Sequence, residues 1–367
     1  MQGAALPRLA VTLGDPAGIG PELVLRAFAD KDVSKVCRLF VYGNQNVLMR
    51  VAEAARIPFS SDVAVLPLVA TASSRCPAAG MPPPPFANPA ELPETGHLLF
   101  DFPFEAAETL RPGCVQAACG AQAYQWIAAA VRDMLARRAD ALVTAPISKE
   151  ALHLAGITFP GHTEILGHLT GTPDPCMVFH SEAWMMGLVT IHEALADVPR
   201  LLTVERVLHT IRLTHEGCVR FGKPAPRIGV LAFNPHAGEG GLFGDEEARV
   251  IAPAIALAKA GGLDVSGPLV PDTAFVGCMK SGAKPPFDAY VAMYHDQGLI
   301  PFKMTAFDSG VNVTLGLPFP RTSPDHGTAF DLAWQGRANA ASFLSATRLA
   351  ASHPGTPSAS SVFSGNG

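Results

Sequence analysis

The sequence predicts an α/β protein of two lobes, in which largely parallel sheets are flanked by helices. Its 367 residues exceed the size at which one hydrophobic core keeps growing. Short, continuously apolar runs alternate with helical patterns along the chain, and such runs are typical of strands buried on both faces of a sheet. Hydrophobic residues make up 48% of the chain and charged residues 16%, a composition typical of a well-buried globular enzyme.

The predicted elements follow one another as strand and helix. The helix over 21–28 comes after a glycine-rich turn, and in the helix over 121–138 the residues Tyr124, Ile127 and Val131 recur at helical spacing. The helix over 245–260 has acidic residues in its first turn, where the helix dipole favours them. This alternation predicts a largely parallel sheet. The apolar runs that we expect to form strands are 8–12, 36–42, 63–69, 141–144, 186–191, 227–233 and 289–294.

Two segments interrupt the pattern. Residues 71–96 are rich in proline and predict an irregular surface excursion. Residues 352–367 are small and polar, which predicts a disordered tail. A change of domain is expected near Ala145, where the stretch TAPISKE leaves a strand and starts a helix.

Composition also limits the class of protein. The formal net charge of -5 gives no basic field, so an anionic ligand must be bound by a local group of cations, and nucleic acid is not expected as a partner. The seven cysteines form no CxxC pair, which favours reduced thiols in a cytoplasmic protein. The sequence shows neither a signal peptide nor an apolar run of the roughly 18 residues that span a bilayer, so we expect no membrane association.

Three histidines follow predicted strands: His192, His236 and His295. The carboxyl ends of parallel strands open into the ligand-binding crevice, so these side chains could converge there. Three imidazoles with one open position suit a catalytic divalent metal such as zinc. One such histidine is more simply explained as a strand cap, but the shared placement of all three favours a metal site. Asp272 and Asp296 are candidates for a fourth ligand or for a partner of an imidazole, and ordinary turn or N-cap positions explain them equally well.

Other polar residues are candidates for binding an anion. Lys303 and Arg321 are cations in apolar surroundings, and arginine binds phosphate or carboxylate with two hydrogen bonds, although both residue types are most often solvated surface groups. The stretch FPGHTEIL places His162 and Thr163 at the start of a predicted helix, where free N–H groups suit an anion. Glu164 fits equally as a first-turn acid. The downstream polar residues of interest are Asn312, Asp325 and His326.

The glycine-rich stretch GDPAGIGPE, residues 14–22, resembles a phosphate-binding loop but fits neither the G-x-G-x-x-G nor the P-loop pattern. The helix after it begins with Pro21, which has no N–H, and Glu22, whose charge would repel a phosphate. The residues alone therefore favour a tight strand-to-helix turn without ligand contacts.

Six motifs stand in the order and spacing of the 4-hydroxythreonine-4-phosphate dehydrogenase family of vitamin B6 biosynthesis, which the chain resembles over about residues 9–349. They are GDPAGIGPEL, VTAPISKEAL, GHTEIL, NPHAGEGG, MYHDQGLIPFK and VNVTLGLPFPRTSPDHGTA. The resemblance implies oxidation of 4-phosphooxy-L-threonine to 2-amino-3-oxo-4-phosphooxybutanoate, which loses carbon dioxide to give 3-amino-2-oxopropyl phosphate. It also implies NAD, with NADP as the alternative, and one divalent ion, either zinc, magnesium or cobalt.

The resemblance assigns roles to residues and lobes. The implied fold is like that of isocitrate and isopropylmalate dehydrogenases, with a non-Rossmann NAD site. It gives a first, cofactor-side lobe of residues 1–145 plus about 315–351, and a second lobe of residues 146–314 with the metal and the interface of a homodimer that shares its active site. The implied metal ligands are His192, His236 and His295, and the implied cofactor contacts are Gly14, Gly18, Asp325 and His326. The implied substrate contacts are His162, Thr163, Lys303, Asn312 and Arg321, and the catalytic candidates are His162, Lys303 and Asp272.

Alternatives remain at this point. Relatives within the family act on 4-phospho-D-threonate, 4-phospho-D-erythronate or aromatic cis-dihydrodiols, and the metal histidines do not separate these substrates. A three-histidine metallohydrolase would turn over without NAD. A two-lobed binding protein with a structural metal would show no turnover.

Overall fold

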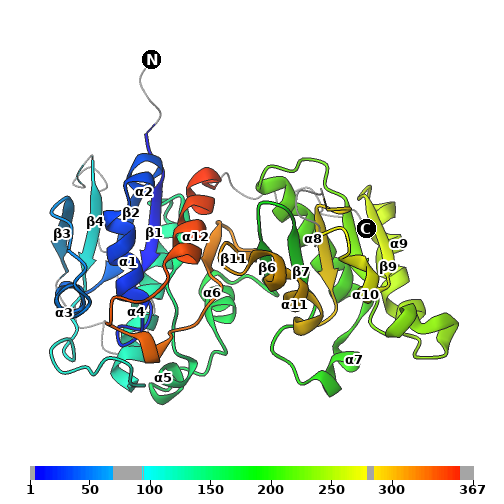
Figure 1. The fold of residues 1–367 in the computed structure, drawn as a ribbon, viewed down its shortest axis with the longest axis horizontal. Helices are drawn as coiled ribbons and strands as arrows, with labels where there is room; N and C mark the ends of the chain where they lie inside the picture. The colour runs from blue at the N-terminus through cyan, green and yellow to red at the C-terminus, as the bar shows by residue number, and fades with distance from the viewer. Residues whose placement is uncertain (1–4, 69–92, 94, 279–284, 356–367) are drawn as a thin grey trace. The chain divides into compact units, whose positions relative to one another are not determined.

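The computed structural model describes residues 5–68, 93, 95–278 and 285–355 (Figure 1). The chain divides into two compact units: unit 1 comprises Met1–Pro173 with Leu317–Gly367, and unit 2 comprises Asp174–Gly316. Each unit contains a sheet that is mostly parallel and flanked by helices, which confirms the predicted α/β class.

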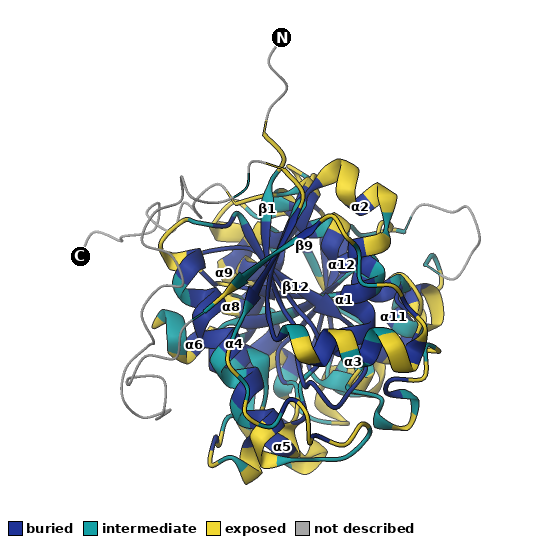
Figure 2. Cartoon of the chain, turned by 90° about the vertical axis from the view of Figure 1, so that its left-hand side faces the viewer, coloured by how far each residue is buried: buried dark blue, intermediate teal, exposed yellow. Residues whose placement is uncertain are grey.

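The sheet of unit 1 has the strand order β3-β4-β2-β1-β5-β12, and its described pairings are parallel. Its strands are β1 (Arg8–Thr12), β2 (Arg38–Gly43), β3 (Val63–Pro67), β4 (His97–Asp101), β5 (Ala141–Thr144) and β12 (Arg321–Pro324). Its helices are α1 (Gly20–Ala29), α2 (Lys31–Val36), α3 (Gln45–Ala55), α4 (Ala117–Leu135), α5 (Lys149–Leu154), α6 (His162–Thr170) and α12 (Ala341–Ser352). Strands β1 and β5 are buried except for Arg8 at the start of β1. Helices α2 and α5 each expose one face (Figure 2).

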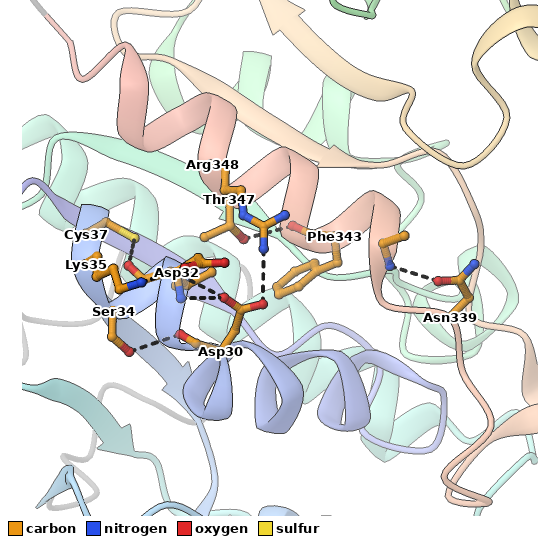
Figure 3. A network of polar contacts seen from close by, with 11 residues as sticks. Asp30, Asp32, Ser34, Lys35, Cys37, Asn339, Phe343, Thr347 and Arg348 are labelled. Carbon is orange, nitrogen blue, oxygen red and sulfur yellow. Dashed lines mark hydrogen bonds and ion pairs between the residues drawn. The ribbon is translucent and has the colours of Figure 1, made fainter.

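A polar network joins α2 to α12 at the surface of unit 1 (Figure 3). Asp30 is the N-cap of α2, and its Oδ1 accepts hydrogen bonds from the N–H groups of Asp32 and Val33, both at 2.9 Å. Its Oδ2 lies 3.1 Å from Nη2 of Arg348 in α12. Such a cap contributes about 1 kcal/mol, more than an exposed ion pair, so the cap explains why α2 begins where it does.

The sheet of unit 2 has the order β11-β6-β7-β10-β8-β9. Strand β6 pairs antiparallel with β11 and β7, and the pairings from β7 to β9 are parallel. The strands are β6 (Cys176–His180), β7 (Met185–Leu188), β8 (Ile228–Leu231), β9 (Val265–Leu269), β10 (Ala289–Ala292) and β11 (Val311–Leu315). The helices are α7 (Val198–Leu201), α8 (Val204–Arg220), α9 (Ala252–Ala260), α10 (Pro271–Ala274) and α11 (His295–Ala306). Trp184, Tyr290 and Phe302 pack together in the core of this unit.

The boundary between the units differs from the predicted one. Residues 146–173, expected in the second lobe, belong to unit 1, and the later boundary follows Gly316. The reason is close helix packing, because a Cβ on Gly120 of α4 would lie 2.1 Å from the backbone oxygen of Ala151 in α5. Tyr124 of α4 also stacks on Phe159, with ring centroids 6.4 Å apart. Apart from residues 93, 95 and 96, the predicted excursion over 71–96 lies outside the described residues, as does the predicted tail beyond residue 355.

Two further observations concern environment. None of the helices in the described part of the chain has the length and apolar character that crossing a bilayer requires. The described cysteines are free thiols: Cys37, Cys114, Cys119, Cys176, Cys218 and Cys278.

Candidate active site

A buried cation lies at the end of the sheet in unit 1. Arg321, the first residue of β12, is 2% exposed, and its Nε and Nη2 donate to Thr144 Oγ1 at 3.2 and 2.6 Å. Thr144 ends β5, which pairs with β12. Burial lowers the pKa of Arg321 to about 9, although the charge of Glu164 acts in the opposite direction. The guanidinium therefore stays charged at neutral pH while it is largely removed from water.

Helix α6 adds a histidine and its own N-terminus to this cation. The N-cap of α6 is Gly161, which has no side chain to accept from the first N–H groups of the helix. His162 follows, and burial together with the positive charge of Arg321 lowers its pKa well below the ordinary value. Its Nε2 is buried and has no hydrogen-bond partner among the described residues. Thr163, the next residue in the sequence, is buried. A neutral imidazole, a guanidinium and a helix N-terminus together suit an anion.

Protein backbone, rather than open space, faces the glycines of the loop after β1. Gly14 has φ +73°, and a Cβ there would lie 2.3 Å from the oxygen of Pro146. A Cβ on Gly20 would lie 2.3 Å from the oxygen of Leu13. Packing alone therefore requires glycine at both positions, as the turn interpretation expects.

Gly18 lies beside the segment that carries Asp325 and His326. A Cβ on Gly18 would lie 3.0 Å from the oxygen of Thr328, and Ile19 N donates to the same oxygen at 3.0 Å. Asp325 N donates to Ser342 Oγ at 3.0 Å, and His326 Nε2 is buried without a partner among the described residues. The structure thus brings three of the four predicted cofactor positions into one neighbourhood of unit 1.

Sequence reasoning missed Asp15 in this loop. Asp15 is 0% exposed, and its Oδ1 accepts from Ala17 N at 2.9 Å. Its Oδ2 is buried with no hydrogen-bond partner among the described residues. Burial raises the pKa of Asp15 to about 6, in spite of the hydrogen bond from Ala17. The sequence signal was an acid three residues after a buried strand, in the glycine-rich turn that follows it.

Unit 2 brings two of the three strand-end histidines together. The rings of His192 and His295 have centroids 5.9 Å apart. Two hydrogen bonds join the segment that leads to His192 to the segment that leads to His295. Thr190 N and Oγ1 donate to the oxygen of Met293 at 3.2 and 2.8 Å. Asp296 Oδ1 lies 2.6 Å from His295 Nδ1, so of the two ring nitrogens Nε2 is the one that a metal ion could reach. Imidazole pairs of this kind suit zinc or cobalt, so the residues present fit a divalent ion.

His236 is placed differently. Its side chain is 66% exposed, and its Nδ1 lies 3.7 Å from Glu239 Oε2. Among the residues that the structure describes, no group of three or more His, Cys, Asp or Glu side chains is arranged to hold a metal ion. One chain therefore does not bring the three predicted ligands together by itself.

The other predicted site residues of unit 2 lie in separate elements. Asp272 is exposed in the first turn of α10. Lys303 is half-buried within α11. Asn312 lies in β11, and its Oδ1 is buried with no partner among the described residues. Of the two carboxylates considered from the sequence, Asp296 is the one that contacts a histidine.

The fold and these residues define an α/β protein with a buried cationic site in one unit and a pair of histidines in the other. Comparison with known families places it further: residues 35–350 match the model of the family "Pyridoxal phosphate biosynthetic protein PdxA", and the chain belongs to this family.

The relatives carry dehydrogenase names. A 4-hydroxythreonine-4-phosphate dehydrogenase of Geobacter metallireducens is 46% identical over 94% of this chain and 95% of its own length. A D-threonate 4-phosphate dehydrogenase of Salmonella typhimurium is 42% identical over 93% of this chain and 97% of its own. The crystal structure of a 4-hydroxythreonine-4-phosphate dehydrogenase from Klebsiella pneumoniae matches with a TM-score of 0.79 and 40% identity, over 95% of this chain and 98% of that one. These names support a dehydrogenase activity.

Proposed function

We propose that the chain is a cytoplasmic, NAD-dependent and divalent-metal-dependent dehydrogenase of pyridoxal phosphate biosynthesis. In this proposal it oxidises 4-phosphooxy-L-threonine to 2-amino-3-oxo-4-phosphooxybutanoate, which decarboxylates to 3-amino-2-oxopropyl phosphate. The family and the names of the relatives support this function. The structural observation that carries it is the buried Arg321 beside His162 at the start of α6, because a phosphorylated substrate needs local positive charge in a chain of net charge -5.

Residues of unit 1 would hold an anionic group of the substrate. Arg321 offers guanidinium N–H groups, Thr163 lies in the first turn of α6, and the unpartnered Nε2 of His162 can donate or accept a proton. Because the pKa of His162 is low, the free enzyme holds it neutral, and a bound dianion would favour its protonated form. Lys303, Asn312 and Asp272 stay predicted substrate or catalytic residues.

The histidines of unit 2 would hold the divalent ion. When bound, such an ion lowers the pKa of a hydroxyl group and stabilises negative charge that develops on its oxygen. We assign His192 and His295 of one chain to the ion, with Asp296 holding the tautomer of His295. Because His236 is exposed and stands apart from these two, we assign the third ligand to His236 of a second copy of the chain.

The surroundings of the histidines support a homodimer that shares this site. Each candidate ligand is followed in sequence by large apolar side chains that are exposed: Leu195 (64%), Leu242 (78%), Phe243 (53%), Ile300 (60%), Met304 (71%) and Phe307 (71%). Contiguous exposed apolar side chains mark interaction surfaces, and these residues are the candidates for such a surface. A second copy that covers them would also bring its own His236.

NAD, or NADP in its place, would bind unit 1 at Gly18, Asp325 and His326. When bound, its nicotinamide accepts the hydride. Gly18 and Thr328 are in contact, and the buried Nε2 of His326 offers a hydrogen-bonding group that the described residues leave unpaired. Gly18→Val should therefore raise the Michaelis constant for NAD, whereas a change in stability alone would favour the plain-turn interpretation.

A second candidate substrate is 4-phospho-D-threonate. Relatives named D-threonate 4-phosphate dehydrogenase are 40–42% identical to this chain, close to the 46% of the relative from Geobacter. Both substrates carry a phosphate and a hydroxyl, so the anion site of unit 1 serves either.

The test is NADH formation with each substrate, with and without a chelator. We expect turnover of 4-phosphooxy-L-threonine that requires both NAD and a divalent ion. Turnover of 4-phospho-D-threonate alone would reject the first substrate, and product formation without NAD would reject the dehydrogenase.

A further inference from the structure

The loop after β8 has a strained backbone conformation. From His236 to Gly240, five consecutive residues have positive φ angles of 53°, 55°, 79°, 45° and 68°. Three of them are His236, Ala237 and Glu239, whose Cβ atoms crowd the following carbonyl oxygen in this left-handed conformation. Such a turn does not form by local preference, so contacts from outside it must impose it.

Glu247, the first residue of a π-helical turn over Glu247–Ile251, supplies these contacts. It is buried, and its Oε1 accepts from the N–H groups of Phe233 and Asn234 at 2.8 and 2.7 Å. Its Oε2 accepts from Asn234 Nδ2 at 3.0 Å. A Cβ on Gly238 would lie 2.9 Å from the same Oε2, so the carboxylate contacts both the entrance and the centre of the turn.

The neighbouring acids do not share this placement. Asp245 is exposed and pairs with Arg249 at 3.3 Å, as an acid at a helix start is expected to do. Glu246 contacts the side chain of Asn234 at 2.6 Å and lies 4.0 Å from Arg249. Of these three acids in the described structure, Glu247 is the one that accepts hydrogen bonds from the loop backbone.

We propose that Glu247 is a positioning residue: its carboxylate imposes the left-handed turn at residues 236–240 and thereby sets the metal affinity of the site to which His236 contributes. The second half of this statement rests on the proposed function, since it takes His236 as a metal ligand. The first half concerns the loop alone and is tested separately.

The first experiment measures Co²⁺ binding to the metal-free full-length protein by visible absorption. We expect Glu247→Ala to weaken binding at least tenfold, and Asp245→Ala, the matched loss of an acid at the same helix start, to stay within twofold of the wild type. Binding by the Glu247→Ala variant within twofold of the wild type would overturn the proposal.

A second substitution separates positioning from general damage to the fold. Glycine adopts positive φ without strain, so Ala237→Gly in the Glu247→Ala background should recover at least threefold in Co²⁺ affinity. A variant that is merely misfolded gains nothing from this change. Absence of any recovery would contradict the claim that Glu247 acts through the backbone of the turn.

Hydrogen exchange tests the loop independently of the metal assignment. Phe243 N donates to the oxygen of Gly238 at 3.2 Å, and this amide should exchange at least fivefold faster in the metal-free Glu247→Ala variant but not in Asp245→Ala. Unchanged exchange would reject the role of Glu247. If His236→Ala binds Co²⁺ as tightly as the wild type, the ligand assignment of the proposed function fails instead, and the exchange result still decides the loop.

Discussion

The candidate anion site of unit 1 and the candidate histidine site of unit 2 differ in whether one chain brings all of their residues together. In unit 1, Arg321 and the Nε2 atom of His162 are buried, and the strand end at Thr144 holds the guanidinium. In unit 2, His192 and His236 are exposed, and the three candidate ligands do not meet within the described residues of one chain. In the proposed function, the anion site of unit 1 would need only its ligand, whereas the histidines of unit 2 would need both an ion and a second chain.

The largest expected effect concerns the candidate anion site of unit 1. Arg321→Met removes the buried charge but keeps an unbranched, flexible side chain, and we expect kcat/KM for the phosphorylated substrate to fall about a thousandfold, or about 4 kcal/mol. The free energy of unfolding should not fall, because burying a charge is itself costly. Arg348→Met, which removes an exposed cation from the same unit, is the control and should keep its activity. Equal activity of the two variants would show that Arg321 binds no substrate anion.

Alanine substitutions at one glycine of each unit test how tightly the backbone is packed there. A Cβ on Gly14 meets the backbone at 2.3 Å at φ +73°, whereas one on Gly240, at φ +68°, meets nothing within 4 Å among the described residues. Gly14→Ala should therefore lower the free energy of unfolding by about 4 kcal/mol, through both overpacking and strain. Gly240→Ala should cost about 1 kcal/mol, from strain alone. Chemical denaturation measures both, and similar values would contradict the contact at Gly14.

Asp15 makes the stability of unit 1 depend on pH. Burial raises its pKa from 3.8 to about 6, so folding favours the protonated acid. Its contribution to stability is therefore complete below about pH 4 and is lost as the pH rises through about 6. Asp15→Asn mimics the neutral acid, and it should match the wild type at pH 4 and exceed it by about 2–3 kcal/mol above pH 7. Unfolding curves at both pH values measure this difference, and a constant difference would refute the raised pKa.

The smallest effect is expected at Asp296, which contacts His295 in unit 2. Asp296→Asn removes the charge that orients the imidazole, and such changes typically weaken metal binding by about tenfold to a hundredfold. Competition with a chromophoric chelator measures the affinity. Asp245→Asn is the control, because Asp245 is exposed and pairs with Arg249 instead of a histidine, and equal losses of metal affinity in both variants would reject the role of Asp296.

The sequence predicted those parts of the fold that follow local patterns. Strands β1 and β5 have the predicted bounds, because continuous apolar runs identify strands buried on both faces. Strand β12 was not predicted, since its sequence RTSP is polar and ends in proline. Its buried Arg321 is accommodated by a hydrogen bond to Thr144, a residue 177 positions away, and no local pattern contains that contact.

The candidate sites show the same limit. The placement of histidines after strands predicted that His192 and His295 lie close together, because the ends of parallel strands share one edge. The separate position of His236 depends on a left-handed turn, and this turn depends on Glu247. From the sequence alone, Glu247 was explained by the helix dipole, since its hydrogen bonds to residues 233 and 234 arise only in the folded unit.

The measurement that tests the incomplete histidine site most directly is complementation in mixed dimers. Variants His192→Ala and His236→Ala are expected to be inactive alone. If His236 acts on the partner's site, co-expressed differently tagged copies form hybrids in which one site keeps all its ligands. Random pairing should then restore about a quarter of the wild-type activity, because half of the dimers are hybrids with one intact site of two. No restored activity in purified hybrids would contradict a site shared in this way.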